Sequence, residues 1–256
     1  ECRDTESAAP DIWLADLGRG PAIRATTHLA NDESPVWSPD GRSVAYARHR
    51  GIREEADIHV MDASAPGAAR PLLTADGPSE HATSWSDQAG AILFEQEGNV
   101  GRQDLWLLPL SNGSPPRPWL ATPASEHRGV ISPDARWVAF ESDRTGRPEI
   151  YVRAFDDPHA GEWAISTRGG RAPRWQSRGA VLYFVSEDWQ VMEVSPGADG
   201  EWANTTPRVL FELPGRLPAP AVPRSARWCR SPRSGSSSSC CTASSARASG
   251  PSSQVC

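Results

Sequence analysis

The sequence predicts an all-β fold: a β-propeller of four-stranded antiparallel blades. Two observations carry this prediction. The chain has 24 Pro, 21 Gly and 11 Trp among its 256 residues and no long segment with a 3.6-residue apolar period, which favours short strands joined by tight turns. It also contains an internal repeat of blade length, and repeats of about 40 to 50 residues with four strands each are typical of propellers.

The repeat emerges when four segments are aligned without gaps: "VWSPDGRSVAY", "SWSDQAGAILF", "VISPDARWVAF" and "RWQSRGAVLYF". The aligned marker residues Trp37, Trp85, Ile131 and Trp175 are 48, 46 and 44 residues apart. Each segment predicts two strands that flank a turn. A β-sandwich of unrelated strands would not explain the same register in four units.

Two further strands complete each unit. Apolar residues largely alternate in "DIHVMD", "DLWLLPL", "EIYVRAF" and "QVMEVSP", as expected for half-buried strands. Short closing strands follow in "RPLLT", "RPWLA", "EWAIST" and "RVLFEL". An earlier copy, "DIWLADL" from Asp11, predicts the last half of a preceding blade. We therefore expect an incomplete propeller with four blades and part of a fifth.

The turn "SPDG" is interpreted as architectural rather than catalytic. Pro, Asp and Gly each suit a defined position of a tight turn. The residues aligned with Asp40 are Gln88, Asp134 and Arg178. A shared acid or metal-binding role would not survive exchange of a carboxylate for a guanidinium, whereas a turn accepts several sequences.

Composition excludes several classes of function. The net charge is −6, so the chain lacks the basic footprint of a nucleic-acid-binding protein. No segment reaches the roughly 18 apolar residues of a membrane span. The N-terminus has neither Met nor a signal-peptide core, so we expect the chain to begin within a longer protein.

No cofactor, metal or catalytic residue is predicted. Four of the five Cys lie after residue 228, and their spacing does not match a zinc site. The chain also has no G-x-S-x-G nucleophile motif. The chain itself is therefore not expected to be an enzyme.

Two domains are predicted: a partial propeller over 1–214 and a Ser/Arg/Cys-rich tail over 215–256. The first contains all 32 Asp and Glu and 20 of the 26 Arg, a net charge of −12, whereas the tail has six Arg, twelve Ser and no acid. Such a composition permits a disordered segment. A reading-frame shift is the second explanation, because "SSSSCC" written with TCG and TGC codons becomes Val and Leu codons in a shifted frame. Sequencing the gene around codons 213–224 distinguishes the two.

The segments "SPVWSPDGRSVAY…ADIHVMD" and "ISPDARWVAFESDRTGRPEIYVRAF" resemble the TolB-like, WD-type propeller repeats of bacteria. Over about residues 11–213, the order of unlike blades is most similar to the C-terminal propeller of bacterial membrane-anchored serine/threonine protein kinases. The kinase domain itself is not in this chain, which has no Gly-rich loop, "HRD" or "DFG". The resemblance implies a non-catalytic sensory or protein-binding module in an extracytoplasmic location, either periplasmic or at the cell surface.

Two alternative functions stay open. The repeats are also similar to those of the gating propeller of prolyl-oligopeptidase-type serine peptidases. A propeller enzyme such as a lactonase or glycosidase, with carboxylates in its channel, is the other alternative. For the non-catalytic module, the acidic body favours a protein or a small polar ligand as partner rather than a polyanion.

Four residues are candidates for ligand binding: Glu33, His81, His127 and Arg171, each four residues before a marker residue. In a propeller, the segment that enters the innermost strand lies at one mouth of the central channel. The competing interpretation is that they are solvated loop residues, alike through repeat ancestry. Two His without a third ligand predict no metal site.

Trp189 and Trp202 are candidates for an aromatic partner surface, although Trp more often packs in a core or between blades.

Overall fold

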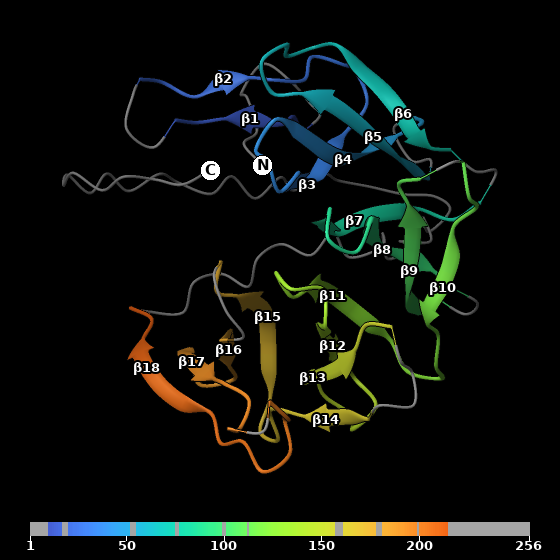
Figure 1. Cartoon of the computed structure of the whole chain (residues 1–256). Coiled ribbons are helices and arrows are strands. Elements are labelled where there is room, and N and C mark those ends of the chain that lie inside the picture. Colours follow the sequence, from blue (N-terminus) through green and yellow to red (C-terminus); the bar gives the residue numbers. More distant parts are fainter. Residues whose placement is uncertain are drawn as a thin grey trace, which may run out of the picture. The chain divides into compact units, whose positions relative to one another are not determined.

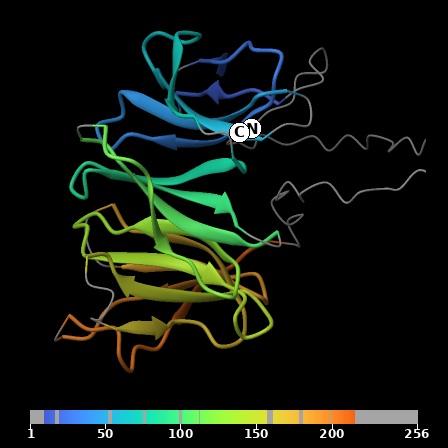
Figure 2. The same cartoon turned by 90° about the vertical axis from the view of Figure 1, so that its right-hand side faces the viewer.

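The computed structural model describes residues 10–16, 20–51, 55–74, 77–98, 101–111, 113–156, 161–177, 181–198 and 200–214. Within these ranges the structure contains β-strands and no helix. The strands form four four-stranded sheets and one two-stranded sheet (Figure 1; Figure 2). The predicted all-β fold, an incomplete propeller of four blades and part of another, is confirmed. The predicted tail, 215–256, lies outside the described residues.

Each sheet contains consecutive strands in chain order, paired antiparallel. The two-stranded sheet contains β1 (Trp13–Leu14) and β2 (Ile23–Arg24). Blade 1 contains β3 (Asp32–Trp37), β4 (Ser43–His49), β5 (Ala56–Asp62) and β6 (Ala69–Leu73). Blade 2 contains β7 (Glu80–Ser86), β8 (Ala91–Glu97), β9 (Gln103–Pro109) and β10 (Arg117–Leu120). Blade 3 contains β11 (Glu126–Ile131), β12 (Trp137–Ser142), β13 (Glu149–Ala154) and β14 (Glu162–Ala164). Blade 4 contains β15 (Gly170–Trp175), β16 (Leu182–Ser186), β17 (Gln190–Val194) and β18 (Arg208–Glu212).

The strand registers match the alignment of the repeats. Each marker residue pairs with the residue at the same position of the following strand. These pairs are Trp37 with Val44, Trp85 with Ile92, Ile131 with Val138, and Trp175 with Leu182. Residues aligned in the sequence are therefore equivalent in space within each blade.

The carboxylate of Asp40 closes the "SPDG" turn through hydrogen bonds within the turn. Ser38 Oγ donates to Asp40 Oδ1 at 2.6 Å, and the backbone N of Arg42 donates to the same oxygen at 3.0 Å. Gly41 has a φ of 70°, which glycine adopts at little cost. Asp134 accepts the corresponding hydrogen bonds in blade 3. Both carboxylates thus hold turn geometry, as the sequence comparison indicated.

The hydrophobic core lies between consecutive blades. Buried apolar residues of neighbouring sheets form shared clusters: Ala45 and Ile58 with Ile92 and Phe94, Leu93 and Leu105 with Val138 and Phe140, and Ile150 and Val152 with Leu182 and Phe184. The first strands also meet, because β3 contacts β7, β7 contacts β11 and β11 contacts β15. Each blade therefore buries its apolar face against the next, which is how repeat folds gain stability.

Trp202 belongs to this core rather than to a partner surface. Its side chain is buried, and its ring makes edge contacts with Trp137 and Trp175 at centroid distances of 6.4 and 5.5 Å. Trp189 is partly buried in the turn between β16 and β17. The partner-surface interpretation of Trp202 is wrong, because aromatic burial against two other Trp rings is the more favourable arrangement.

Gly129 in β11 marks a tight approach between blades 2 and 3. A Cβ at this position would lie 2.6 Å from Leu93 Cδ2 and 2.9 Å from Leu105 Cδ1. Overpacking a core costs about 1–3 kcal/mol, so Gly129→Ala is expected to lower the free energy of unfolding by that amount. Urea denaturation measures the loss. Gly41→Ala is the control: a Cβ there meets no atom within 4 Å, and only its positive φ adds strain. Unchanged stability of Gly129→Ala would contradict the close packing.

Candidate functional site

The four residues singled out in the sequence all lie within first strands. Each is the second residue of its strand and pairs with the second strand of the same blade: Glu33 with Ala47, His81 with Glu95, His127 with Glu141, and Arg171 with Val185. They therefore lie at the entry to the first strands and not in solvated loops; that they bind a ligand at a channel mouth stays a prediction. A register shift follows directly after these residues in β3, β11 and β15, and one residue later, after Ala82, in β7. This irregularity interrupts the alternation that reveals a strand.

The register shift gives the following residue an unusual backbone. Ser34, Arg128 and Ala172 have φ values of 55°, 49° and 54°. A bulge of this kind leaves a backbone N–H outside the strand ladder. In two blades that N–H is bound by a carboxylate of the preceding blade: Arg128 N donates to Glu95 Oε1 at 2.5 Å, and Ala172 N donates to Glu141 Oε1 at 2.6 Å. Glu95 and Glu141 thus connect consecutive blades.

Glu33 connects blades 1 and 2 in a different way. Its Oε1 lies 2.8 Å from His49 Nε2 and 3.8 Å from His81 Nδ1 of the next blade. Burial of Glu33 raises its pKa, but the hydrogen bond with His49 and the charges of His81 and His49 outweigh burial, so the pKa lies below its ordinary value. The rings of His49 and His81 meet edge to face at 6.4 Å.

His127 and Glu95 form the corresponding pair between blades 2 and 3. His127 Nδ1 lies 3.4 Å from Glu95 Oε2. Burial lowers the pKa of His127, but the hydrogen bond and charge of Glu95, together with the charge of Glu141, raise it above the ordinary value. Burial raises the pKa of Glu95, but its hydrogen bond to His127, the charge of His127 and the N–H of Arg128 bring it below the ordinary value. Both groups therefore favour the charged state.

Glu141 is the most tightly bound carboxylate of this region. Arg128 Nη1 donates to its two oxygens at 3.0 and 2.9 Å, and the Ala172 N–H completes its partners. The Glu141 side chain is only 3% exposed. Arg171, next to Ala172, is exposed, and no hydrogen bond or ion pair between described residues joins it to Glu33, His81 or His127.

The first-strand cluster is the name we give to the charged and titratable side chains gathered here. Its members are Glu33, His49, His81, Glu95, His127, Arg128, Glu141, Arg171 and Arg174. Arg171 and Arg174 flank the bulge of β15, and the charge of Arg174 interacts with Arg128 and Glu141. Sequence reasoning missed His49, Glu95, Arg128, Glu141 and Arg174. A signal for two of them existed, since Glu95 and Glu141 end the aligned segments "ILFE" and "VAFE".

A second set of carboxylates lies at the first residue of three first strands, β3, β7 and β11. Asp32, Glu80 and Glu126 are fully buried. Their partners on the second strand differ: Arg48 lies 2.7 Å from Asp32, whereas Glu80 has the neutral Gln96 at 3.4 Å. Glu126 has Arg144 at 3.8 Å, so Asp32 has the shortest contact with a cation of the three.

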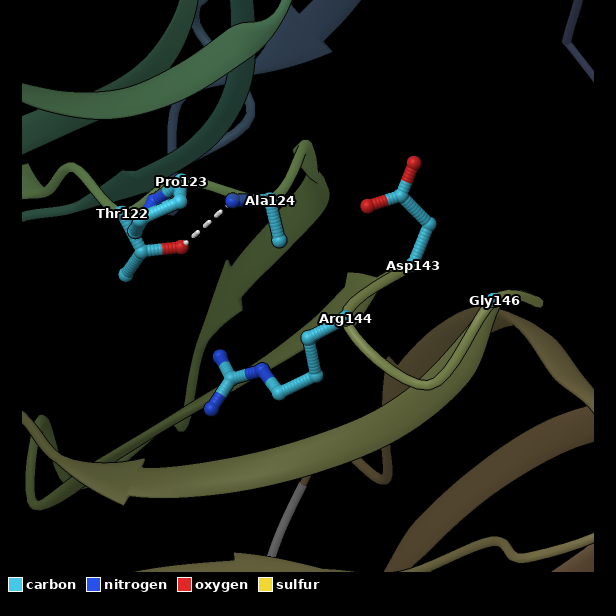
Figure 3. Close-up of a pocket in the computed structure, with 6 residues that line it drawn as sticks. All are labelled: Thr122, Pro123, Ala124, Asp143, Arg144 and Gly146. Atoms are coloured by element: carbon cyan, nitrogen blue, oxygen red, sulfur yellow. Dashed lines mark hydrogen bonds between the residues drawn. The ribbon is translucent and has the colours of Figure 1, made fainter.

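A pocket of about 560 Å³ lies on blade 3, between the turn at 122–124 and the turn at 143–146 (Figure 3). Arg144 is the cationic residue of its lining, and it already binds Glu162, Ser142 Oγ and the face of the Tyr151 ring. Because these contacts occupy the guanidinium, little positive charge in the pocket is available to bind a ligand.

Among the described residues, no three His, Cys, Asp or Glu side chains are grouped so that they could hold a metal ion. The described part of the chain also contains no helix long and apolar enough to cross a membrane.

Consecutive four-stranded sheets that meet through their first strands define an incomplete β-propeller, and comparison with known proteins supports a TolB-like one. No protein-family model matches the chain. The Tol-Pal system protein TolB of Bordetella pertussis is 28% identical over 149 residues, which are 57% of this chain and 32% of that protein. The chain thus spans about a third of that curated relative.

Solved structures show the same fold. A putative TolB from Agrobacterium tumefaciens has a TM-score of 0.59 and 20% identity, over 74% of this chain and 69% of that chain. Prolyl oligopeptidase B from Galerina marginata has a TM-score of 0.54 and 9% identity, over 73% of this chain and 29% of that chain. The architecture is therefore shared by TolB and by peptidases, and the fold alone does not assign an activity.

Proposed function

We propose that this chain is the non-catalytic binding propeller of a larger, extracytoplasmic protein and that the first-strand cluster is its binding surface. The observation that carries this proposal is the cluster itself: titratable and charged side chains lie on the first and second strands of consecutive blades, and the first strands of the four blades contact one another. In propellers, first strands line the central channel, where ligands enter. Similarity to TolB supports the extracytoplasmic location.

The partner is a protein or a small polar ligand rather than a nucleic acid, because the chain as a whole is acidic. The finer assignment, the sensory propeller of a receptor-type serine/threonine kinase, rests on the order of unlike blades in the sequence. A kinase catalytic domain and a membrane span encoded upstream would support it.

The gating propeller of a prolyl-oligopeptidase-type peptidase is the second candidate. The likeness to Galerina marginata prolyl oligopeptidase B favours it. A hydrolase domain encoded downstream of the propeller, in the same or a corrected frame, would support this candidate over the kinase.

Selection from a random peptide library displayed on phage tests the binding surface. The full chain is the bait, and a variant with His81→Ala, His127→Ala and Arg171→Ala is the matched comparison. We expect selected peptides to bind the wild type and to lose affinity for the variant, because ligand contacts are removed. Selected peptides that bind both proteins equally would place the binding surface elsewhere.

Two control measurements accompany this experiment. A thermal melt of the triple variant checks that it is folded. The second is an assay with a Gly-Pro chromogenic substrate. If the wild type hydrolyses this substrate and a matched mock preparation does not, the non-catalytic assignment is contradicted.

A further inference from the structure

We propose that the first-strand cluster binds an acidic peptide segment and that it binds this segment more tightly as the pH falls. This inference rests on the proposed function and adds the chemistry of the partner.

The carboxylates of the cluster are its least exposed charged groups, and they are already bound. The side chains of Glu33, Glu95 and Glu141 are 8%, 17% and 3% exposed. Glu33 contacts His49, Glu95 contacts the Arg128 N–H and His127, and Glu141 contacts Arg128 and the Ala172 N–H. Their acceptor oxygens are consumed by contacts within and between blades.

The nitrogen-bearing side chains are the ones that reach solvent. The His127 and Arg128 side chains are 35% and 25% exposed, and that of His81 is 22% exposed. Arg171 and Arg174 on β15 are exposed. The Arg128 guanidinium is already bound by Glu141, so Arg171 and Arg174, with the histidines, are the groups that present positive charge to a ligand, although the chain as a whole is acidic. Carboxylates are the side-chain groups that complement guanidinium and imidazolium donors.

The histidines set the net charge of the cluster. Its three carboxylates and three guanidinium groups balance, so the three imidazoles decide whether the cluster is near neutral or strongly positive. Imidazoles change charge near neutral pH. Protonation of all three would raise the charge of the cluster from about zero to about +3.

Carboxylates face the two histidines that reach across blades. Glu95 on β8 and Glu141 on β12 face His127, and although burial and Arg128 on its own strand oppose them, the pKa of His127 lies above its ordinary value. Around His81 lie Glu33 on β3, His49 on β4 and the charge of Glu95 on β8. An imidazolium at either position therefore meets opposite charge within the cluster.

Fluorescence anisotropy with hexaglutamate that carries a rhodamine label, whose charge does not change between the two pH values, tests the proposal on the full chain. Hexalysine and an uncharged Gly-Ser hexapeptide are the comparison probes. Glutamate side chains stay ionised at about pH 6 and about pH 8, so a change in affinity between these values reports on the protein. We expect hexaglutamate alone to bind, about tenfold more tightly at the lower pH and more weakly at high salt.

Two sets of substitutions separate pH dependence from affinity. His81→Gln with His127→Gln is expected to reduce the difference in affinity between the two pH values, because only His49 of the three imidazoles is left. Arg171→Gln with Arg174→Gln is expected to weaken binding at both. Arg117→Gln with Arg208→Gln, on the outer strands β10 and β18, is the matched control and should leave binding unchanged. The arginine pairs are exposed, and thermal melts check that every variant is folded.

Three outcomes would overturn the inference: equal binding of hexaglutamate and the uncharged peptide, affinity independent of pH, or displacement of hexaglutamate by inorganic phosphate at the same anion concentration. The last would mean a general anion site. If library peptides bind the cluster but are not acidic, this inference fails and the proposed binding surface stands. If the cluster variants do not affect any peptide, the proposed surface itself fails.

Discussion

Glu141→Ala is expected to lower the free energy of unfolding by about 3 kcal/mol, because it removes one partner of a largely buried ion pair. The substitution leaves the Arg128 guanidinium without the two hydrogen bonds that it donates and leaves the Ala172 N–H unpaired between blades 3 and 4. An unsatisfied donor at a buried position keeps its desolvation cost. Urea denaturation, followed by Trp fluorescence, measures the change.

Glu187→Ala provides the control, since the Glu187 side chain is 68% exposed in the turn after β16. Its stability should stay close to that of the wild type. The double variant Arg128→Leu with Glu141→Leu tests the cause: it should be less destabilised than the two single changes together, since it leaves no unpaired charge. A loss for Glu141→Ala no larger than that for Glu187→Ala would contradict the role of Glu141 as a connection between blades.

Glu80→Gln is expected to reduce the loss in the free energy of unfolding that accompanies a rise in pH. Burial raises the pKa of Glu80 to about 7, and the charge of Asp57 adds to this, whereas Arg50 and Gln96 act in the opposite direction. In the unfolded chain the same group titrates near 4.5. Between these values the folded state holds a proton that the unfolded state releases, so the stability contributed by Glu80 is complete below pH 4.5 and is lost as the pH rises to about 7.

The size of this loss follows from the shift in pKa and is about 3 kcal/mol. Urea denaturation of the wild type and of Glu80→Gln across that pH range measures it as the difference between the two proteins, which removes the contributions of other groups. We expect the variant to gain stability relative to the wild type as the pH rises, with no further gain above neutral pH. Glu187→Gln, as an exposed control, should show a constant difference. A constant difference for Glu80→Gln as well would contradict a proton held at this position.

The sequence was sufficient for the blades because a blade is a local structure. Its four strands are consecutive, and the alternation in "DIHVMD" or the turn at Asp40 depends on nearby residues. The start of each first strand was not predictable in this way. Ser34, Arg128 and Ala172 adopt positive φ although none is Gly, and the resulting bulge breaks the alternation just where Glu33, His127 and Arg171 stand.

The partners within the candidate site depend on contacts between blades, which a single repeat does not encode. His81 and His127 were visible because they recur at one position, but the carboxylates that face them belong to the preceding blade. Trp202 was misjudged for a similar reason: it lies outside the repeated segments, and its burial depends on Trp137 of blade 3 and Trp175 of blade 4.

The carboxylates that bind the backbone of the next blade are unevenly distributed along the chain. Glu95 and Glu141 fasten blade 2 to blade 3 and blade 3 to blade 4, whereas Ala47 stands at the same position of blade 1 and has no carboxylate to offer. Blade 1 is therefore connected to blade 2 by a different device: the contact of Glu33 with His81 and the shared apolar cluster stand where the later blades add a carboxylate bound to a backbone N–H.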